Sequence, residues 1–270
     1  MLNISIVLYH PDWHGEVIPL VEELLRIKCL HKVYLVDNSE QKAREEIWLQ
    51  WNEKKVQYIF TAKNVGYGSG HNIALRESIY DDIPYHLVLN SDILLQSADI
   101  DALCTFMDTH PLVGQLMPHI VSPDGKTQYL CKLLPTPLDV FGRRFLPKRL
   151  MARRNARYEL RASGYDHPMN VPYLSGCFML LRTEAALKAR LFDERFFMYP
   201  EDIDLTRRIH RDYLTLYYPA VTVVHNHARA SYHSPKMLWI HIVNMCRYFN
   251  KWGWFRDPER TAMNRAARYA

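Results

Sequence analysis

The sequence predicts an α/β protein with a Rossmann-like central sheet that is mostly parallel and flanked by helices. Short apolar runs rich in β-branched and aromatic residues recur along the chain, and stretches of helical period separate them. Strands that alternate with helices form parallel βαβ units, which place helices on both faces of a sheet. Ligands bind such sheets beyond the carboxyl ends of the strands, so the residues that follow each strand are the first candidates for a site.

The first strands are expected at four runs, which are Ile4–Tyr9, Lys32–Val36, Val56–Phe60 and His86–Leu89. Apolar side chains with helical spacing predict helices over Val17–Ile27 and around Ile73–Ile79. The alternation weakens after about Leu112, and a later strand is expected over Leu214–Val224. The tail over Pro235–Phe255 has a helical pattern rich in aromatic residues. No internal repeat or flexible linker is evident, so we expect one domain over residues 1–230 and a C-terminal helical appendage over 231–270.

The composition of the 270 residues, 48% hydrophobic and 23% charged, is that of a globular protein rather than a disordered one. The longest uncharged apolar runs stop at about a dozen residues, short of the roughly 18 that span a bilayer. Five scattered cysteines without C-x-x-C spacing argue against a disulfide framework and a structural zinc site. The N-terminus resembles a first strand more than a signal peptide. We therefore expect a cytoplasmic protein, peripheral at most to the inner face of the membrane.

Acidic and amide side chains follow two of the predicted strands. Asp37 ends the second strand, where it could accept hydrogen bonds from a base or a ribose, although Asp is also a common helix cap. Asp92 follows the fourth strand in the run Asn90-Ser91-Asp92. A carboxylate at this edge is well placed to hold a divalent metal that bridges two phosphates. The alternative is that Asp92 only caps a turn and binds no metal.

Three glycines, Gly66, Gly68 and Gly70, alternate between Asn64 and Asn72 at the start of a predicted helix. Such a turn lets the backbone approach a ligand, and a helix N-terminus favours phosphate. The spacing matches neither the G-x-G-x-x-G dinucleotide pattern nor a P-loop. A tight strand-to-helix turn explains any single glycine, but three together favour nucleotide binding.

The densest group of acids is Glu201, Asp202 and Asp204, just after Pro200 and an aromatic run. Proline and acids suit the first turn of a helix, which accounts for one or two of the carboxylates. Aromatic neighbours would raise a carboxylate pKa toward that of a general base.

Two histidines, His225 and His227, end the late strand and point the same way because they are two residues apart. A single histidine there is more often structural. One of the pair could complete a metal site with Asp92.

Together these motifs resemble family 2 glycosyltransferases, and most closely their rhamnosyltransferase-like branch, which builds bacterial O-antigen and other surface polysaccharides. The resemblance runs from Ile4 to about Lys251. It is carried by Val36-Asp37-Asn38-Ser39, Asn64-x-Gly66 through Gly70-His71-Asn72, Asn90-Ser91-Asp92, Ser175-Gly176-Cys177-Phe178-Met179, Phe192-Asp193-Glu194 with Phe196-Phe197, and Glu201-Asp202 with Asp204.

The resemblance implies a GT-A fold and an inverting sugar transfer, with rhamnose from dTDP-rhamnose as the best match. It implies a polyprenyl-diphosphate-linked or oligosaccharide acceptor and a divalent metal, Mg²⁺ or Mn²⁺. By motif, Asp202 is the catalytic base, and Asp92 with His225 holds the metal; Asn90 replaces the first acid of the family's D-x-D motif. The implied donor-side residues are Tyr9, Asp37, Asn64, Gly66, Gly70, Asn72, Asn90 and Ser91, and the acceptor-side residues are Ser175, Gly176 and Glu201.

Charge is concentrated in one segment. Lys132–Arg161 holds nine basic and two acidic residues, a net charge of +7, whereas the whole chain carries +5. A solvated helix face is the ordinary explanation. The functional explanation is attraction to anionic phospholipid or to the diphosphate of a lipid-linked acceptor. The aromatic and basic tail suits an interfacial anchor, a packed helix or a dimer face equally.

Two other classes of protein share some of these features. A nucleotidyltransferase could use the same sheet, nucleotide pocket and metal-binding acid, but it would release pyrophosphate from a nucleoside triphosphate. A nucleic-acid-binding protein could use the basic segment, yet no motif that reads bases accompanies it. We expect no nucleic-acid partner.

Overall fold

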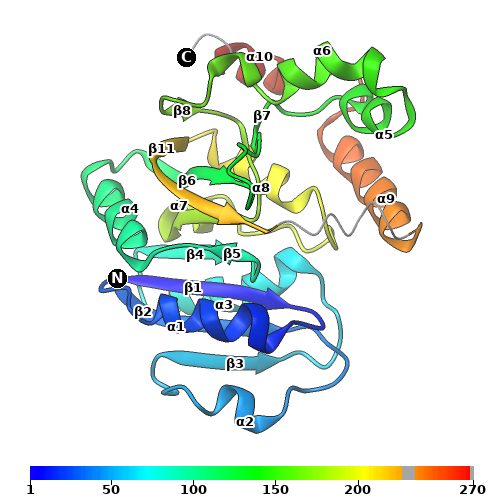
Figure 1. Ribbon diagram of the computed structural model, residues 1–270. Helices are drawn as coiled ribbons and strands as arrows, with labels where there is room; N and C mark the ends of the chain where they lie inside the picture. Colours follow the sequence, from blue (N-terminus) through cyan, green and yellow to red (C-terminus); the bar gives the residue numbers. More distant parts are fainter. Residues whose placement is uncertain (227–234, 268–270) are drawn as a thin grey trace.

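The computed structural model describes residues 1–226 and 235–267 (Figure 1). Its strands are β1 Leu2–Leu8, β2 Leu30–Asp37, β3 Val56–Phe60, β4 Tyr85–Leu89, β5 Ile93–Leu94, β6 Val113–Val121, β7 Cys131–Lys132, β8 Met169–Asn170, β9 Tyr173–Leu174, β10 Phe178–Arg182 and β11 Leu214–His225. Its α-helices are α1 Ile18–Leu24, α2 Glu45–Trp48, α3 Tyr67–Tyr80, α4 Ser97–Thr109, α5 Arg143–Phe145, α6 Lys148–Tyr158, α7 Thr183–Lys188, α8 Glu201–Ile209, α9 Pro235–Trp252 and α10 Pro258–Ala266.

The strands form one large mixed sheet in the order β3-β2-β1-β4-β10-β6-β11-β5, with β8 also paired to β11. β1 runs parallel to β2 and β4, β2 runs parallel to β3, and β6 runs parallel to β11. β10 is antiparallel to both of its neighbours, so β6 points the same way as β4. The carboxyl ends of β1, β2, β3, β4 and β11 therefore share one edge. The predicted mostly parallel sheet is confirmed.

Alternating side chains of the central strands bury both faces of the sheet. In β4, Leu87 and Leu89 pack into one core cluster, while Val88 packs into another. The first cluster includes Leu20, Val21 and Leu24 of α1, and the second includes Leu205 of α8. Figure 1 shows α1 on one side of the sheet and α3 on the other. Because both faces of the sheet are covered, a binding site is expected at the polar edge formed by the strand ends.

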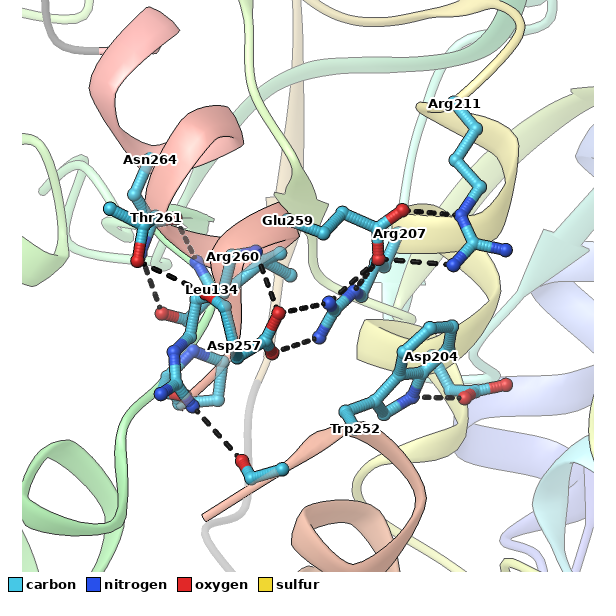
Figure 2. A network of polar contacts seen from close by, with 12 residues as sticks. Leu134, Asp204, Arg207, Arg211, Trp252, Asp257, Glu259, Arg260, Thr261 and Asn264 are labelled. Carbon is cyan, nitrogen blue, oxygen red and sulfur yellow. Dashed lines mark hydrogen bonds and ion pairs between the residues drawn. The ribbon is translucent and has the colours of Figure 1, made fainter. Parts of the chain in front are cut away.

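The C-terminal helices are bound to α8 through buried charges (Figure 2). Arg207 is 1% exposed, and its guanidinium donates two hydrogen bonds of 2.7 Å to the carboxylate of Asp257. It also pairs with Glu259 at 2.7 Å and lies 4.0 Å from the ring centroid of Trp252. Asp204, fully buried, accepts from Trp252 Nε1 at 2.8 Å. The third acid of the sequence motif thus has a structural role.

Four predicted strands and the late strand are present close to their predicted bounds. The tail differs, because its helix ends at Trp252 and a second helix, α10, follows. Gly253 has φ +103°, which ends α9, and the Asp257 side chain caps α10 at the amide of Arg260. The expected domain boundary, between residues 230 and 231, lies outside the described residues. Within residues 1–226 and 235–267, no helix is both long and apolar enough to cross a membrane.

Candidate active site at the carboxyl ends of the strands

The strand ends bring together the acids that the sequence singled out. Asp37 is the last residue of β2, and Asn90 and Asp92 directly follow β4. His225 is the last residue of β11, and it pairs with Ile93 of β5, the residue after Asp92. The amide of Asn226 donates to the Asp92 carbonyl oxygen at 2.9 Å. This pairing places the Asp92 and His225 side chains next to each other.

Asp92 and His225 form a candidate metal-binding pair. Asp92 Oδ1 lies 3.3 Å from His225 Nε2. On the other side of the ring, Nδ1 lies 2.9 Å from Gln128 Oε1, and Gln128 Nε2 donates to the His225 carbonyl oxygen at 2.8 Å. If Nδ1 carries the proton toward Gln128, the lone pair of Nε2 faces Asp92, as a metal-ligating histidine requires. His227, the less certain ligand, lies outside the described residues.

Asp202 lies at the start of α8 against a close-fitting backbone. Its Oδ2 accepts from the Gly176 amide at 2.9 Å, and its Oδ1 accepts from the Ile203 amide at 2.7 Å. A Cβ at Gly176 would lie 3.0 Å from Asp202 Cβ, so only glycine lets this loop approach without displacing the acid. The Tyr173 hydroxyl lies 3.4 Å from Oδ2. The predicted acceptor-side Gly176 is thus in direct contact with the predicted base.

The two neighbouring carboxyl groups have different electrostatics. Burial raises the pKa of Asp202 to about 6, although the amides of Gly176 and Ile203, Lys132 and Tyr173 oppose this rise. Burial and the adjacent Asp202 raise the pKa of Glu201 well above its usual range. The pKa of about 6 leaves Asp202 mostly ionised at neutral pH, whereas Glu201 holds its proton more strongly than an exposed glutamate does. A carboxylate with a pKa near 6 suits a general base.

Lys132, which sequence analysis placed in the basic segment, instead faces this site. Its strand β7 pairs with β9, and its ammonium lies 5.1 Å from the ring centroid of Tyr173. Its positive charge lowers the pKa of Asp202. The position of Lys132 could not be inferred from its local sequence because the pairing of β7 with β9 joins residues about 40 apart.

We expect Lys132→Met to shift the pH profile of sugar transfer. Loss of the ammonium raises the pKa of Asp202 above its value of about 6, so the base is ionised only at higher pH. The acidic limb of kcat/KM should move to higher pH, with less change on the plateau. Lys126→Met is the matched control because Lys126 is exposed and pairs with Asp124 at 2.6 Å, outside the site. A limb that stays in place in Lys132→Met would contradict this electrostatic link.

Tyr67 joins the two halves of the site, and sequence analysis did not single it out. Its hydroxyl lies 2.8 Å from Asn90 Oδ1 and 2.7 Å from the Gly176 carbonyl oxygen. It therefore connects the strand end that precedes Asp92 with the loop that holds Asp202. The position of Tyr67, an aromatic residue between two glycines, was the sequence feature that could have identified it. Ser175 lies beside this loop and is partly buried.

The glycines of the predicted nucleotide turn have a packing role. Gly66 has φ +94°, and a Cβ there would lie 2.6 Å from the Phe197 carbonyl oxygen. A Cβ at Gly70 would lie 2.7 Å from Val7 Cγ2. The Gly66 amide donates to Asn64 Oδ1 at 3.0 Å, and the Tyr67 amide donates to Phe197 O at 3.0 Å. These two amides are thus used within the protein, and phosphate binding by this turn stays a prediction.

Other predicted donor residues differ in how they are engaged. Asn72 is 1% exposed, and it bonds to both the amide and the carbonyl of Phe192, which gives it a structural role. The carboxylate of Asp37 accepts from the Tyr58 hydroxyl at 2.6 Å and from a backbone amide. Ser91 and Tyr9 are more open: Ser91 is partly buried, and Tyr9 is 49% exposed.

Part of the basic segment is neutralised locally. Glu159, buried, pairs with Arg143 and with Arg161, and Asp139 pairs with Arg154 at 2.6 Å. The only two acids of the segment are thus both bound to its arginines. With Lys132 at the active site, the surface charge is smaller than the sequence implied.

The sheet order and this edge site define a class of protein, the glycosyltransferases of GT-A fold. A mannosyltransferase from Pyrobaculum calidifontis, solved with GDP-Man and Mn²⁺, superposes with a TM-score of 0.58 at 15% identity, covering 99% of this chain and 69% of that one. GalNAc-T7, solved with UDP, GalNAc and Mn²⁺, superposes with a TM-score of 0.59 at 13% identity and covers 83% of this chain. This chain spans 43% of the GalNAc-T7 chain.

The chain belongs to the glycosyltransferase-like family 2, whose family model matches residues 18–250. It is 29% identical over 251 residues to an N-acetylglucosaminyl-diphospho-decaprenol L-rhamnosyltransferase of Mycobacterium tuberculosis, covering 87% of this chain and 79% of that one. It is 26% identical over 258 residues to the rhamnosyltransferase WbbL of Escherichia coli K12, covering 92% of both. The protein is therefore a glycosyltransferase, and the resemblance drawn from its motifs is confirmed.

Proposed function

We propose that this glycosyltransferase transfers rhamnose, with inversion, from dTDP-rhamnose to a hydroxyl of a lipid-linked sugar diphosphate at the cytoplasmic face of the membrane. The support for the sugar is that both curated relatives are rhamnosyltransferases, and one of them acts on a diphospho-decaprenol acceptor by its name. The single observation that supports this chemistry is the environment of Asp202. This residue is a buried carboxylate with a pKa of about 6, held by two backbone amides.

Asp202 is the proposed base. Direct displacement at the anomeric carbon requires a group that removes the proton of the acceptor hydroxyl as the new bond forms. The Gly176 and Ile203 amides fix the two oxygens of Asp202. Because Gly176 has no side chain, it does not crowd the carboxylate on the side proposed for the acceptor. Burial and the adjacent Asp202 raise the pKa of Glu201, which makes Glu201 the weaker candidate for the base. A base that deprotonates the acceptor hydroxyl for direct attack favours a single displacement, and hence inversion.

Asp92 and His225 are the proposed metal ligands. Among residues 1–226 and 235–267, no group of three or more His, Cys, Asp and Glu is arranged to hold a metal ion, so two protein ligands are available. This set fits Mg²⁺ or Mn²⁺, which complete their shells with phosphate oxygens and water. Asp92 Oδ1 is buried and faces His225 Nε2 at 3.3 Å, so one cation could bind both atoms. A bound cation would supply positive charge for the departing diphosphate.

Asp37, Asn90 and Ser91 are proposed to line the donor side, because Asp37 ends β2 and the other two precede Asp92 at the same edge of the sheet. Ser175 and Glu201 are proposed for the acceptor side, because each is the sequence neighbour of a residue in the contact between Gly176 and Asp202. Membrane contact is proposed for the aromatic side chains that the C-terminal half exposes. Phe145 is 62% exposed, Trp239 is 67% exposed and Phe255 is 88% exposed. Exposed aromatic side chains of this kind suit a membrane interface.

The function can be tested with purified protein, dTDP-rhamnose and N-acetylglucosaminyl diphosphate carrying a short isoprenoid chain. We expect dTDP release and a rhamnosylated product of inverted anomeric configuration, detected by NMR. UDP- and GDP-sugars should give much slower transfer. Rapid transfer from one of those donors, with none from dTDP-rhamnose, would overturn the choice of sugar.

The metal requirement is tested in the same assay. EDTA should abolish transfer, and Mn²⁺ or Mg²⁺ should restore it. Asp92→Ala should weaken Mn²⁺ binding and metal-dependent dTDP binding in titrations. Asp124→Ala, which removes an exposed carboxylate from the loop next to Gln128, serves as the control and should change neither. Full activity in EDTA would refute the metal proposal.

A further inference from the structure

A cavity of about 380 Å³ lies between α6, the segment that follows β7, and α10. Its lining includes Leu133, Thr136, Arg153, Arg157 and Tyr158. None of these residues belongs to the donor side or to the proposed metal pair. The cavity is held open by α10, because Asn264 bonds to both the amide and the carbonyl of Leu134 at 2.7 and 2.9 Å.

The cavity has an excess of positive charge. Three arginines line it, against one acid, Asp139. Asp139 pairs with Arg154 at 2.6 Å and accepts from the Thr136 hydroxyl at 2.6 Å. Arg153 and Arg157 are exposed, and neither has an ion pair within residues 1–226 and 235–267. Two guanidinium groups one helical turn apart can bind a phosphate or diphosphate through paired hydrogen bonds.

Apolar side chains continue from the same cavity. Leu133 and Tyr158 form part of its wall. On α6, Leu150 precedes Arg153 by three residues and therefore lies on the same side of the helix, and it is 74% exposed. Leu146, in extended backbone just before α6, is 44% exposed. A ligand that combines a phosphate group with a hydrocarbon chain matches this arrangement of basic and apolar side chains.

The cavity wall is continuous with the surroundings of the proposed base. The Leu133 amide donates to the Tyr158 carbonyl oxygen at 3.0 Å. Lys132, the preceding residue, pairs across β7 and β9 with Tyr173, whose hydroxyl lies 3.4 Å from Asp202 Oδ2. The cavity thus adjoins the acceptor side of Asp202 rather than the metal pair.

We infer that Arg153 and Arg157 bind the diphosphate of the lipid-linked acceptor, with its hydrocarbon directed along Leu150. This inference rests on the proposed function for its choice of ligand. The headgroup of an anionic phospholipid offers the same phosphate chemistry, so the test must separate the two sources.

The test compares Arg153→Gln/Arg157→Gln with Lys148→Gln/Arg149→Gln. Both double variants remove two charges from α6, but only the first pair lines the cavity. Binding of geranyl diphosphate, measured by calorimetry, should weaken by about tenfold or more in the first variant and by less than about twofold in the second. In the transfer assay, the first variant should raise the acceptor KM and leave kcat and the donor KM unchanged.

Three outcomes would overturn the inference. The first is that wild-type protein fails to bind geranyl diphosphate. The second is that both double variants lose binding equally, which would indicate diffuse attraction. The third is that Arg153→Gln/Arg157→Gln loses binding only to phosphatidylglycerol vesicles, which would assign the arginines to a headgroup. Because geranyl diphosphate binding needs no donor, it can succeed even if rhamnose transfer fails, and the two proposals are therefore tested separately.

Discussion

The Asp202→Asn variant is expected to lower kcat/KM by about 10²–10⁴-fold. The amide cannot take the proton of the acceptor hydroxyl. Its oxygen can still accept from the Gly176 amide, but its nitrogen then faces the Ile203 amide, so some of the free energy of unfolding should be lost as well. The affinity for dTDP should change little. The measurement is steady-state transfer at several pH values, because the loss of a base also removes the acidic limb near pH 6.

Glu201→Gln is the matched control for this prediction. Glu201 is 3% exposed and adjacent in sequence, and burial and Asp202 raise the pKa of its carboxyl group. Because the acidic limb is assigned to Asp202, replacing Glu201 by its amide should preserve the pH profile and most of the activity. If Asp202→Asn keeps nearly full activity, or if Glu201→Gln abolishes the acidic limb, then Asp202 is not the base.

The second large effect is expected on stability. Arg207→Met leaves the carboxylate of Asp257 buried beside Glu259 without its partner, and breaking such a pair costs about 3–5 kcal/mol of unfolding free energy. The guanidinium is 1% exposed, so solvent screens the lost pair only weakly. Urea or thermal unfolding measures the change, and transfer assays show whether α8 still holds Asp202 in place.

Two variants give this prediction its controls. Arg211→Met removes a half-exposed arginine that pairs with Glu259 in the same network, and it should cost no more than about 1 kcal/mol. Adding Asp257→Asn to Arg207→Met removes the unpaired charge and keeps a residue that caps α10, so part of the lost stability should return. Equal losses in Arg207→Met and Arg211→Met would show that burial of the pair is unimportant.

The α/β sheet was predictable because each parallel strand leaves a local apolar run, as in Val56–Phe60. The order of the strands was not, since β10 enters between β4 and β6 from a distant part of the chain. The second C-terminal helix was missed although Asp257-Pro258 is a helix-start signal. A tail rich in aromatic residues was weighed only as one helix.

The sequence could place Asp92 and His225 at one edge of the sheet because each lies at the end of a strand, and Asp202 in the first turn of a helix; their roles stay predictions. The contacts of Lys132, Tyr67 and Gln128 depend on pairings between distant segments, and a local sequence pattern cannot predict such pairings. Asn72 and the glycines fit a ligand-binding pattern, and the structure also gives each of them a packing or hydrogen-bonding partner within the protein. Such partners come from distant segments, so the sequence pattern alone could not reveal them, and donor binding by these residues stays a prediction.

The links from α8 to the last helices impose an order on synthesis. Asp204 and Arg207 of α8 are buried against partners that lie between Lys251 and Glu259. A nascent chain that has emerged only as far as α8 therefore carries the proposed base on a helix in which Asp204 has Arg208 as a partner but Arg207 lacks both of its carboxylates. The enzyme should become active only after α10 leaves the ribosome, so that a chain still in synthesis consumes no nucleotide sugar.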